Sequence, residues 1–203
     1  MLATMTGLLR LGRTGAPQPT LLDYGSGAGR WSVAARRAGF RVTAYEPSAG
    51  RQRDAGGVEV IGSLGILAGR TFDVINLEQV LEHLPDPVSS LRGLREYCHD
   101  QTVLRISVPD VARLGTALWR GYPFDGKAMH MLSPFEHLHG FQRSSLLALI
   151  DRAGLRPCSG LRLLRSCPRY VAERAAIALG SPYGRTTALA QFRIGPVEQP
   201  CCS

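Results

Sequence analysis

The sequence of 203 residues has no long apolar run and few cysteines. No window approaches the roughly 20 apolar residues that a membrane-spanning helix needs. The short apolar stretch near the start is interrupted by Arg10 and Arg13, so it lacks the continuous apolar core of a signal peptide. The five cysteines include no C-x-x-C pair, which gives no support to a disulfide framework or a zinc site. We therefore expect a protein of the reducing cytoplasm that is held together by its apolar core.

Lysine is nearly absent as well, because Lys127 is the only one and arginine supplies the rest of the positive charge. Lysine and arginine together number 24, against 16 aspartate and glutamate residues, which gives a net charge of +8. Such a surface could attract nucleic acid, anionic lipid or a phosphorylated substrate. The basic residues are scattered rather than gathered in blocks, so we favour an incidental excess over a specific nucleic-acid site.

Short apolar runs alternate with helix-like segments along most of the chain. Strands are predicted at 20–24, 41–45, 58–61, 72–77, 102–108, 155–164 and 187–194. Helices are predicted at 31–38, from the Asp86-Pro87 start, at 144–153 and at 171–179. This alternation predicts a mostly parallel sheet with helices on both faces.

The strand at 20–24 runs into a glycine-rich turn, D-Y-G-S-G-A-G at 23–29. Such a turn lets a ligand approach the backbone closely and presents N–H groups at the start of the next helix. Glu46 ends the next strand, where an acidic side chain can accept hydrogen bonds from ribose hydroxyls. The G-x-G-x-G spacing differs from the G-x-G-x-x-G of dinucleotide enzymes, and the absence of a following Gly-Lys-Ser/Thr excludes a P-loop. The pattern therefore predicts a nucleoside-like ligand.

Residues 22–29 resemble the first motif, hydrophobic-D-x-G-x-G-x-G, of the class I S-adenosylmethionine-dependent methyltransferases. The resemblance implies a Rossmann-like α/β sandwich of three layers, whose seven-stranded sheet is mostly parallel with an antiparallel last strand. It also implies S-adenosylmethionine as cofactor, with its methionine end at Asp23 and the glycine turn and its ribose at Glu46. The adenine would lie near Ser63, where the family often has an acidic residue. The complete set that we expect at the cofactor is Asp23, Gly25, Ser26, Gly27, Gly29, Glu46, Pro47, Ser63, Leu64 and Glu78.

Residues 78–87, E-Q-V-L-E-H-L-P-D-P, resemble the E-V-L-E-H-x-x-D-P stretch of small-molecule methyltransferases, including O-methyltransferases of ubiquinone biosynthesis. This resemblance implies a small-molecule acceptor that is methylated at oxygen, with nitrogen and carbon as alternatives. An RNA methyltransferase is a second hypothesis, which the net charge favours, although no N-P-P-Y or D-P-P-Y tetrapeptide is present. A non-catalytic binding protein that retained the fold is a third.

His83 is the candidate catalytic residue, because it follows the fourth predicted strand, where ligands bind in open α/β sheets. An oxygen acceptor needs a base, and the alternative for His83 is a structural role at the turn before the next helix. Some relatives hold a divalent cation with two carboxylates and this histidine. Gln79 replaces the first carboxylate here and leaves Glu82 and His83, so we expect no metal.

Residues 110–140 interrupt the regular alternation and contain several aromatic side chains and three histidines. We expect this segment to form a lid or acceptor pocket within a single domain of residues 1–203, with 196–203 as a tail. About 20 residues precede the first strand, which is too few for a separate substrate domain. His137 and His139, with His130 nearby, would face the same way on a strand, and we favour a loop that faces solvent or substrate over a metal cluster.

Overall fold

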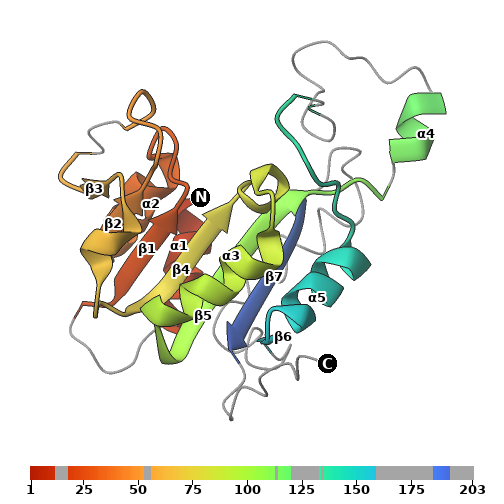
Figure 1. The fold of residues 1–203 in the computed structure, drawn as a ribbon. Helices are drawn as coiled ribbons and strands as arrows, with labels where there is room; N and C mark the ends of the chain where they lie inside the picture. Colours follow the sequence, from red (N-terminus) through yellow and green to blue (C-terminus); the bar gives the residue numbers. More distant parts are fainter. Residues whose placement is uncertain are drawn as a thin grey trace.

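The computed structural model describes residues 1–11, 18–52, 56–112, 114–119, 133, 135–158 and 185–192 (Figure 1). The helices of the described part are α1 (Leu2–Leu11), α2 (Arg30–Ala38), α3 (Pro87–Gly93), α4 (Leu114–Trp119) and α5 (Arg143–Arg152), with the short 3₁₀ helices η1 (Leu64–Leu67), η2 (Leu81–His83) and η3 (Leu94–Tyr97). The strands are β1 (Thr20–Tyr24), β2 (Arg41–Tyr45), β3 (Glu59–Ile61), β4 (Phe72–Glu78), β5 (Cys98–Pro109), β6 (Leu155–Pro157) and β7 (Arg185–Phe192).

The strands form one seven-stranded sheet in the order β3-β2-β1-β4-β5-β7-β6. Neighbouring strands from β3 to β5 pair in parallel, and β7 is antiparallel to both β5 and β6. The predicted sheet, mostly parallel with an antiparallel last strand, is therefore confirmed. The chain moves outward from β1 to β3 and then returns to place β4 on the other side of β1. Ligands of open α/β sheets bind at such a switch point, at the carboxyl ends of the strands.

Helices cover both faces of the sheet, as Figure 1 shows for α3 and α5 on one face and α1 and α2 on the other. Successive residues of each strand point to opposite faces, so Leu21 and Leu22 belong to different apolar clusters. Leu22 joins the cluster that contains Leu91 of α3 and Ile150 of α5. Leu21 joins the cluster that contains Met5 of α1. The continuous apolar strands of the sequence follow from burial on both faces.

The helix α1 was not predicted from the sequence. Met5 and Leu8, three residues apart and thus on one helix face, are 0% and 1% exposed and pack in the cluster with Leu21. The apolar stretch near the start of the chain therefore forms part of the core. Segment 110–140 also contains a helix that was not predicted, the six-residue α4.

The predicted strands at 20–24 and 41–45 are confirmed with the same bounds. The strand β5 begins at Cys98 rather than at Thr102, beside an irregularity in the pairing of β4 with β5. The predicted strand 155–164 is confirmed only as β6, and its part from 159 onward lies outside the described residues, as do the predicted helix 171–179 and the tail 196–203. Among the helices of the described part, none combines the length and the apolar character needed to cross a bilayer.

Candidate cofactor and acceptor site

The glycine turn between β1 and α2 lies at the carboxyl edge of the sheet. Its backbone is left-handed at Gly25 (φ 73°), Gly27 (φ 52°) and Gly29 (φ 71°), a conformation that costs other residues about 1–2 kcal/mol. The N–H groups of Gly25 and Ser26 donate to the carbonyl oxygen of Tyr45 at 2.9 and 3.0 Å, which ties the turn to the end of β2. A Cβ atom at Gly27 would meet nothing within 4 Å. The turn therefore faces open space at Gly27.

Glu46 directly follows β2 and lies beside this turn. Its side chain accepts hydrogen bonds from the N–H of Gly27 at 2.8 Å and from the N–H of Ser48 at 3.0 Å. The residue is 6% exposed. A carboxylate has about four acceptor positions, so two remain for other donors after these contacts. Glu46 thus joins the glycine turn to the loop after β2 and retains acceptor capacity at the same place.

Asp23 and Glu78 belong to one buried polar network beneath the glycine turn. Asp23 accepts hydrogen bonds from the hydroxyl of Ser32 and, at 2.7 Å, from the amide of Asn76. The guanidinium of Arg105 donates to the Asn76 side-chain oxygen at 2.7 Å and to Glu78 at 2.6 Å. Burial raises the pKa of Asp23, and the hydrogen bonds from Ser32 and Asn76 act in the opposite direction. These hydrogen bonds connect β1 with β4 through Asp23 and Asn76, and β4 with β5 through Arg105.

Arg105 was not predicted as part of the site. It is 5% exposed, and its guanidinium carbon lies 4.2 Å from the centre of the Trp31 ring in α2. This distance suits a cation–π contact. The sequence did contain a signal for this role, an arginine within the mostly apolar run of β5. Such an arginine is expected to be buried, and a buried arginine needs polar partners.

The remaining predicted cofactor residues lie in the loops that follow β2 and β3. Pro47 is exposed and directly follows Glu46. Ser63 is exposed and accepts a hydrogen bond from the N–H of Gly65 at 3.3 Å, and Leu64 is half-buried at the start of η1. Because β2 and β3 are parallel to β1, these loops emerge at the same edge as the glycine turn.

The chain leaves β4 through a strained turn at Gln79, the one non-glycine residue of the described part with positive φ (54°). The Gln79 N–H donates to the Ser107 carbonyl oxygen at 2.7 Å. The turn places Val80 against Gly25, where a Cβ on the glycine would lie 2.7 Å from Val80 Cγ2. It then leads into η2, so His83 lies at the same edge of the sheet as the glycine turn.

Residues 135–141 are attached to η2. Leu138 and His139 donate their backbone N–H groups to the carbonyl oxygen of Glu82 at 2.7 and 3.2 Å. The Nδ1 atom of His83 lies 2.8 Å from the carbonyl oxygen of Glu136. The rings of His83 and His137 meet edge to face with their centres 4.9 Å apart. Segment 110–140 thus returns to the carboxyl edge at its end.

The sequence favoured a loop for His137 and His139, and residues 137–140 form neither helix nor strand, so the two side chains do not share the facing of a strand. The chain bends at Leu138. The Nε2 atom of His139 lies 2.9 Å from the Leu84 carbonyl oxygen, whereas His137 contacts the ring of His83. Backbone hydrogen bonds to Glu82, rather than to a neighbouring strand, hold this segment. His130 lies outside the described residues.

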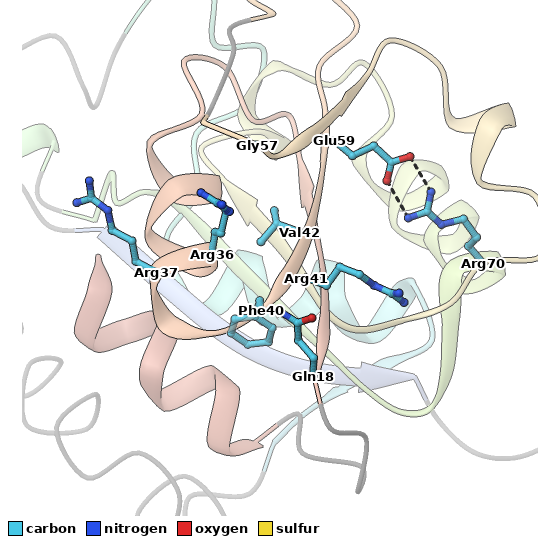
Figure 2. A pocket seen from close by; sticks show the side chains of 9 residues that line it. All are labelled: Gln18, Arg36, Arg37, Phe40, Arg41, Val42, Gly57, Glu59 and Arg70. Atoms are coloured by element: carbon cyan, nitrogen blue, oxygen red, sulfur yellow. Dashed lines mark hydrogen bonds and ion pairs between the residues drawn. The ribbon is translucent and has the colours of Figure 1, made fainter.

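A concave region of about 700 Å³ lies at the opposite edge of the sheet (Figure 2). Its residues belong to the starts of β2 and β3, the end of α2 and the approaches to β1 and β4, so it is not at the edge where cofactors of this fold bind. Arg70 and Glu59 form an ion pair of 2.9 Å in its wall. It is lined by Gln18, Arg36, Arg37, Phe40, Arg41, Val42, Gly57, Glu59 and Arg70.

Comparison with known proteins agrees with this fold. The profile of the methyltransferase domain family matches residues 3–159. No curated protein sequence matches the chain.

Solved structures share the fold at low sequence identity. The plantazolicin methyltransferase BamL, in complex with a triazolic desmethylPZN analog and SAH, is 14% identical, with a TM-score of 0.68 over 94% of this chain and 84% of BamL. The 1,6-didemethyltoxoflavin-N1-methyltransferase of Burkholderia thailandensis, with bound 1,6-didemethyltoxoflavin and S-adenosylhomocysteine, is 18% identical, with a TM-score of 0.57 over 95% of this chain and 78% of that enzyme. The mitomycin 7-O-methyltransferase MmcR is 18% identical, with a TM-score of 0.58 over 94% of this chain and 54% of MmcR.

The family match covers most of the chain, including the glycine turn, Glu46, the network around Asp23 and the attached segment 135–141. The chain belongs to the methyltransferase domain family and has the fold of the class I S-adenosylmethionine-dependent methyltransferases.

Proposed function

We propose that the protein transfers the methyl group of S-adenosylmethionine to an oxygen atom of a small molecule. The observation that carries the proposal is the position of Glu46 beside the open face of Gly27, at the switch point of the sheet. Two of the structural relatives, BamL and the Burkholderia thailandensis enzyme, were solved with the demethylated cofactor. Their fold supports a cofactor at the same edge.

The residues of this edge suit the cofactor's distinct parts. The glycine turn offers backbone N–H groups and room at Gly27 for the methionine end, and Glu46 retains acceptor positions for ribose hydroxyls. Pro47, Ser63 and Leu64 lie in the adjoining loops, where we place the adenine. Asp23 and Glu78 act through the network with Arg105, which holds the ends of β1 and β4 in place.

The cofactor supplies a methyl group already activated on a positive sulfonium. In the transfer, the bond between sulfur and the methyl carbon breaks, a bond from the acceptor oxygen to that carbon forms, and the acceptor proton leaves. The protein's contribution is to align the acceptor with the methyl group and to exclude water. His83 lies at the same edge, and its Nδ1 points to the Glu136 carbonyl oxygen. With Nδ1 at this carbonyl, Nε2 is the ring nitrogen that we assign to accept the acceptor proton.

We place the acceptor beside segment 110–140, of which residues 120–132 lie outside the described part; its described ends follow β5 and contact η2. Trp119 and Phe135 of this segment are 89% and 97% exposed, so they do not belong to the core and could cover a bound molecule. The relatives MmcR and the Burkholderia thailandensis enzyme are described as an O- and an N-methyltransferase, so the fold alone does not select the atom. The resemblance of residues 78–87 to O-methyltransferases supports oxygen.

Calorimetry with S-adenosylhomocysteine, with NAD as the control ligand, tests the cofactor. We expect one S-adenosylhomocysteine per chain and no binding of NAD, and the reverse result would reject the proposal. Cofactor with a carbon-13 methyl group then tests the acceptor atom in a panel of hydroxylated and amino compounds. The carbon-13 shift of the product distinguishes O-methyl from N-methyl groups, and N-methyl products alone would contradict the assignment to oxygen.

A further inference from the structure

Four arginine side chains line the concave region of about 700 Å³ at the amino edge of the sheet. Arg36 and Arg37 come from the last turn of α2. Arg41 begins β2, and Arg70 lies just before β4. Among the described residues that line the region, Glu59 is the one acidic side chain. Four arginines against one glutamate leave an excess of three positive charges.

Two of these guanidinium groups are held in the wall by contacts with the chain. Arg36 donates to the carbonyl oxygen of Gly56, and a Cβ atom on the neighbouring Gly57 would lie 3.4 Å from an Arg36 nitrogen, so this glycine leaves room for the guanidinium. Arg70 donates to the two carboxylate oxygens of Glu59 at 3.1 and 2.9 Å. Side chains that are already fixed lose less conformational entropy when a ligand binds.

The other two guanidinium groups keep their donors available. Within the described part of the chain, no group accepts a hydrogen bond from the side chain of Arg37 or Arg41, and both residues are exposed. Each guanidinium has five N–H donors and remains protonated in proteins. Hydrogen bonds from Arg70 hold the pKa of Glu59 below its usual value, so this carboxylate stays ionised and paired with Arg70.

The helix dipole explains only part of this arrangement. Arg36 and Arg37 suit the negative end of α2, where cations stabilise a helix. Arg41 and Arg70 lie outside that helix, so their position beside the same space has another reason. The partial charge of a helix end is about half an elementary charge, which leaves the region strongly positive.

We propose that this region binds a small molecule that carries a chain of two or more phosphate groups. The planar guanidinium matches phosphate oxygens through paired N–H donors, and a phosphate chain offers oxygens to several separated arginines at once. The volume lies in the range of about 300–1,000 Å³ that is typical of small-ligand pockets. Figure 2 shows the apolar side chains of Phe40 and Val42 between the arginines of α2 and Arg41, where the body of a ligand can lie.

This region and the cofactor edge lie at opposite ends of the same strands. Arg41 begins β2, and Glu46 directly follows its end. A strand of five residues spans about 17 Å, so the two ligands do not overlap. The phosphate site therefore does not depend on the proposed methyl transfer.

Calorimetry with sodium tripolyphosphate tests the site at ~150 mM salt, where exposed charges more than about 8 Å apart are largely screened. We expect one tripolyphosphate per chain. Uridine triphosphate is the second probe, because it lacks the adenine that would compete at the cofactor edge. Tighter binding of uridine triphosphate would support the proposal with a nucleotide as the ligand. Equal affinities would support it with the phosphate chain alone as the recognised group.

Arg36→Gln and Arg41→Gln should each weaken tripolyphosphate binding by about 10-fold or more, because each removes hydrogen bonds between charged groups. Arg152→Gln is the matched control. Arg152 is exposed in the last turn of α5, on the other face of the sheet, and its replacement lowers the net charge by the same amount. This control should keep wild-type affinity. Circular dichroism checks that all three variants are folded.

Absence of tripolyphosphate binding at ~150 mM salt would overturn the proposal. An equal loss of affinity in Arg152→Gln would do so as well, because the attraction would then belong to the whole positive surface. An RNA that binds more tightly than tripolyphosphate at this salt, and less tightly in Arg36→Gln, would assign the region to nucleic acid instead. Titration of the same samples with S-adenosylhomocysteine keeps the two proposals separate, since either ligand can bind without the other.

Discussion

Gly25 and Val80 are in direct contact, although they follow different strands. A Cβ atom on Gly25 would lie 2.7 Å from Cγ2 of Val80, closer than such atoms pack in proteins. The glycine turn after β1 and the strained turn after β4 therefore pack against each other at the edge of the sheet where we propose that the cofactor binds. The contact explains why the first glycine of the turn has no room for a side chain.

Gly25→Ala should destabilise the protein by about 2–5 kcal/mol, because left-handed backbone strain and overpacking against Val80 add. Gly27→Ala is the control, since its backbone is also left-handed but its Cβ meets nothing within 4 Å, and it should cost only about 1–2 kcal/mol. Urea unfolding measures both. The double variant Gly25→Ala/Val80→Ala should lose less than the sum of its single changes, and additive losses would contradict the contact.

Glu46→Ala should weaken S-adenosylhomocysteine binding by about 10- to 100-fold, because hydrogen bonds to a charged acceptor are worth about 1.5–3 kcal/mol each. Glu46→Gln keeps one acceptor oxygen and should lose less. Calorimetry at constant pH and salt provides both affinities. Unchanged affinity in Glu46→Ala would remove Glu46 from the cofactor site.

Arg105→Leu should lower the free energy of unfolding by about 3–5 kcal/mol, because it removes the guanidinium from the carboxylate of Glu78, whose side chain is only 9% exposed. Arg70→Leu is the matched control, since its ion pair with Glu59 has side chains that are 38% and 48% exposed, and it should change stability by at most about 1 kcal/mol. Chemical denaturation of the two variants makes the comparison. A similar loss of unfolding free energy in both variants would show that the hydrogen-bond network around Arg105 does not stabilise the strands that it connects.

Cys98 should resist alkylation in the folded protein, because burial raises the pKa of its thiol from 9.0 to about 12. The thiolate is the reactive form, so near pH 8 the folded protein should react roughly 1,000-fold more slowly at this residue than the unfolded chain. Iodoacetamide labelling with peptide mass spectrometry measures the two rates. Equal rates would mean that Cys98 is accessible and ionised in the native state.

The arginine-lined region at the amino edge of the sheet predicts weak attraction of polyanions. Arg37 and Arg41 are exposed there, and Figure 2 shows both among the side chains that line the region. Binding of RNA should be independent of sequence, fall steeply between low salt and ~200 mM salt, and weaken further in Arg37→Ala/Arg41→Ala. Fluorescence anisotropy with two unrelated RNAs measures it. Tight binding that survives ~200 mM salt would instead support the RNA methyltransferase hypothesis.

Several features of this protein followed from the sequence because they depend on neighbours along the chain. The alternation of apolar runs and helical segments predicted the sheet, and the strands at 20–24 and 41–45 were confirmed with the same bounds. The glycine spacing predicted the turn, since left-handed backbone at three alternate positions needs glycine. The Asp86 cap of α3 was likewise local, with its carboxylate accepting from the N–H of Ser89 at 2.9 Å.

Contacts between distant segments were decided only by the tertiary structure. Arg105 reaches Glu78 and Asn76 because the pairing of β4 with β5 sets Asn76 opposite Arg105, and His137 reaches His83 because the chain returns to η2 after a long excursion. Neither contact follows a periodic pattern or a fixed spacing in the sequence. The length of a loop does not determine where the chain returns to the sheet. The burial of α1 was also decided by the tertiary structure. The apolar residues at positions 5 and 8 stabilise a helix only when a sheet is present for them to pack against. The sequence by itself thus determined the order of the strands, the helices α2, α3 and α5, and the glycine turn, and packing over long separations determined which polar side chains meet beside that turn.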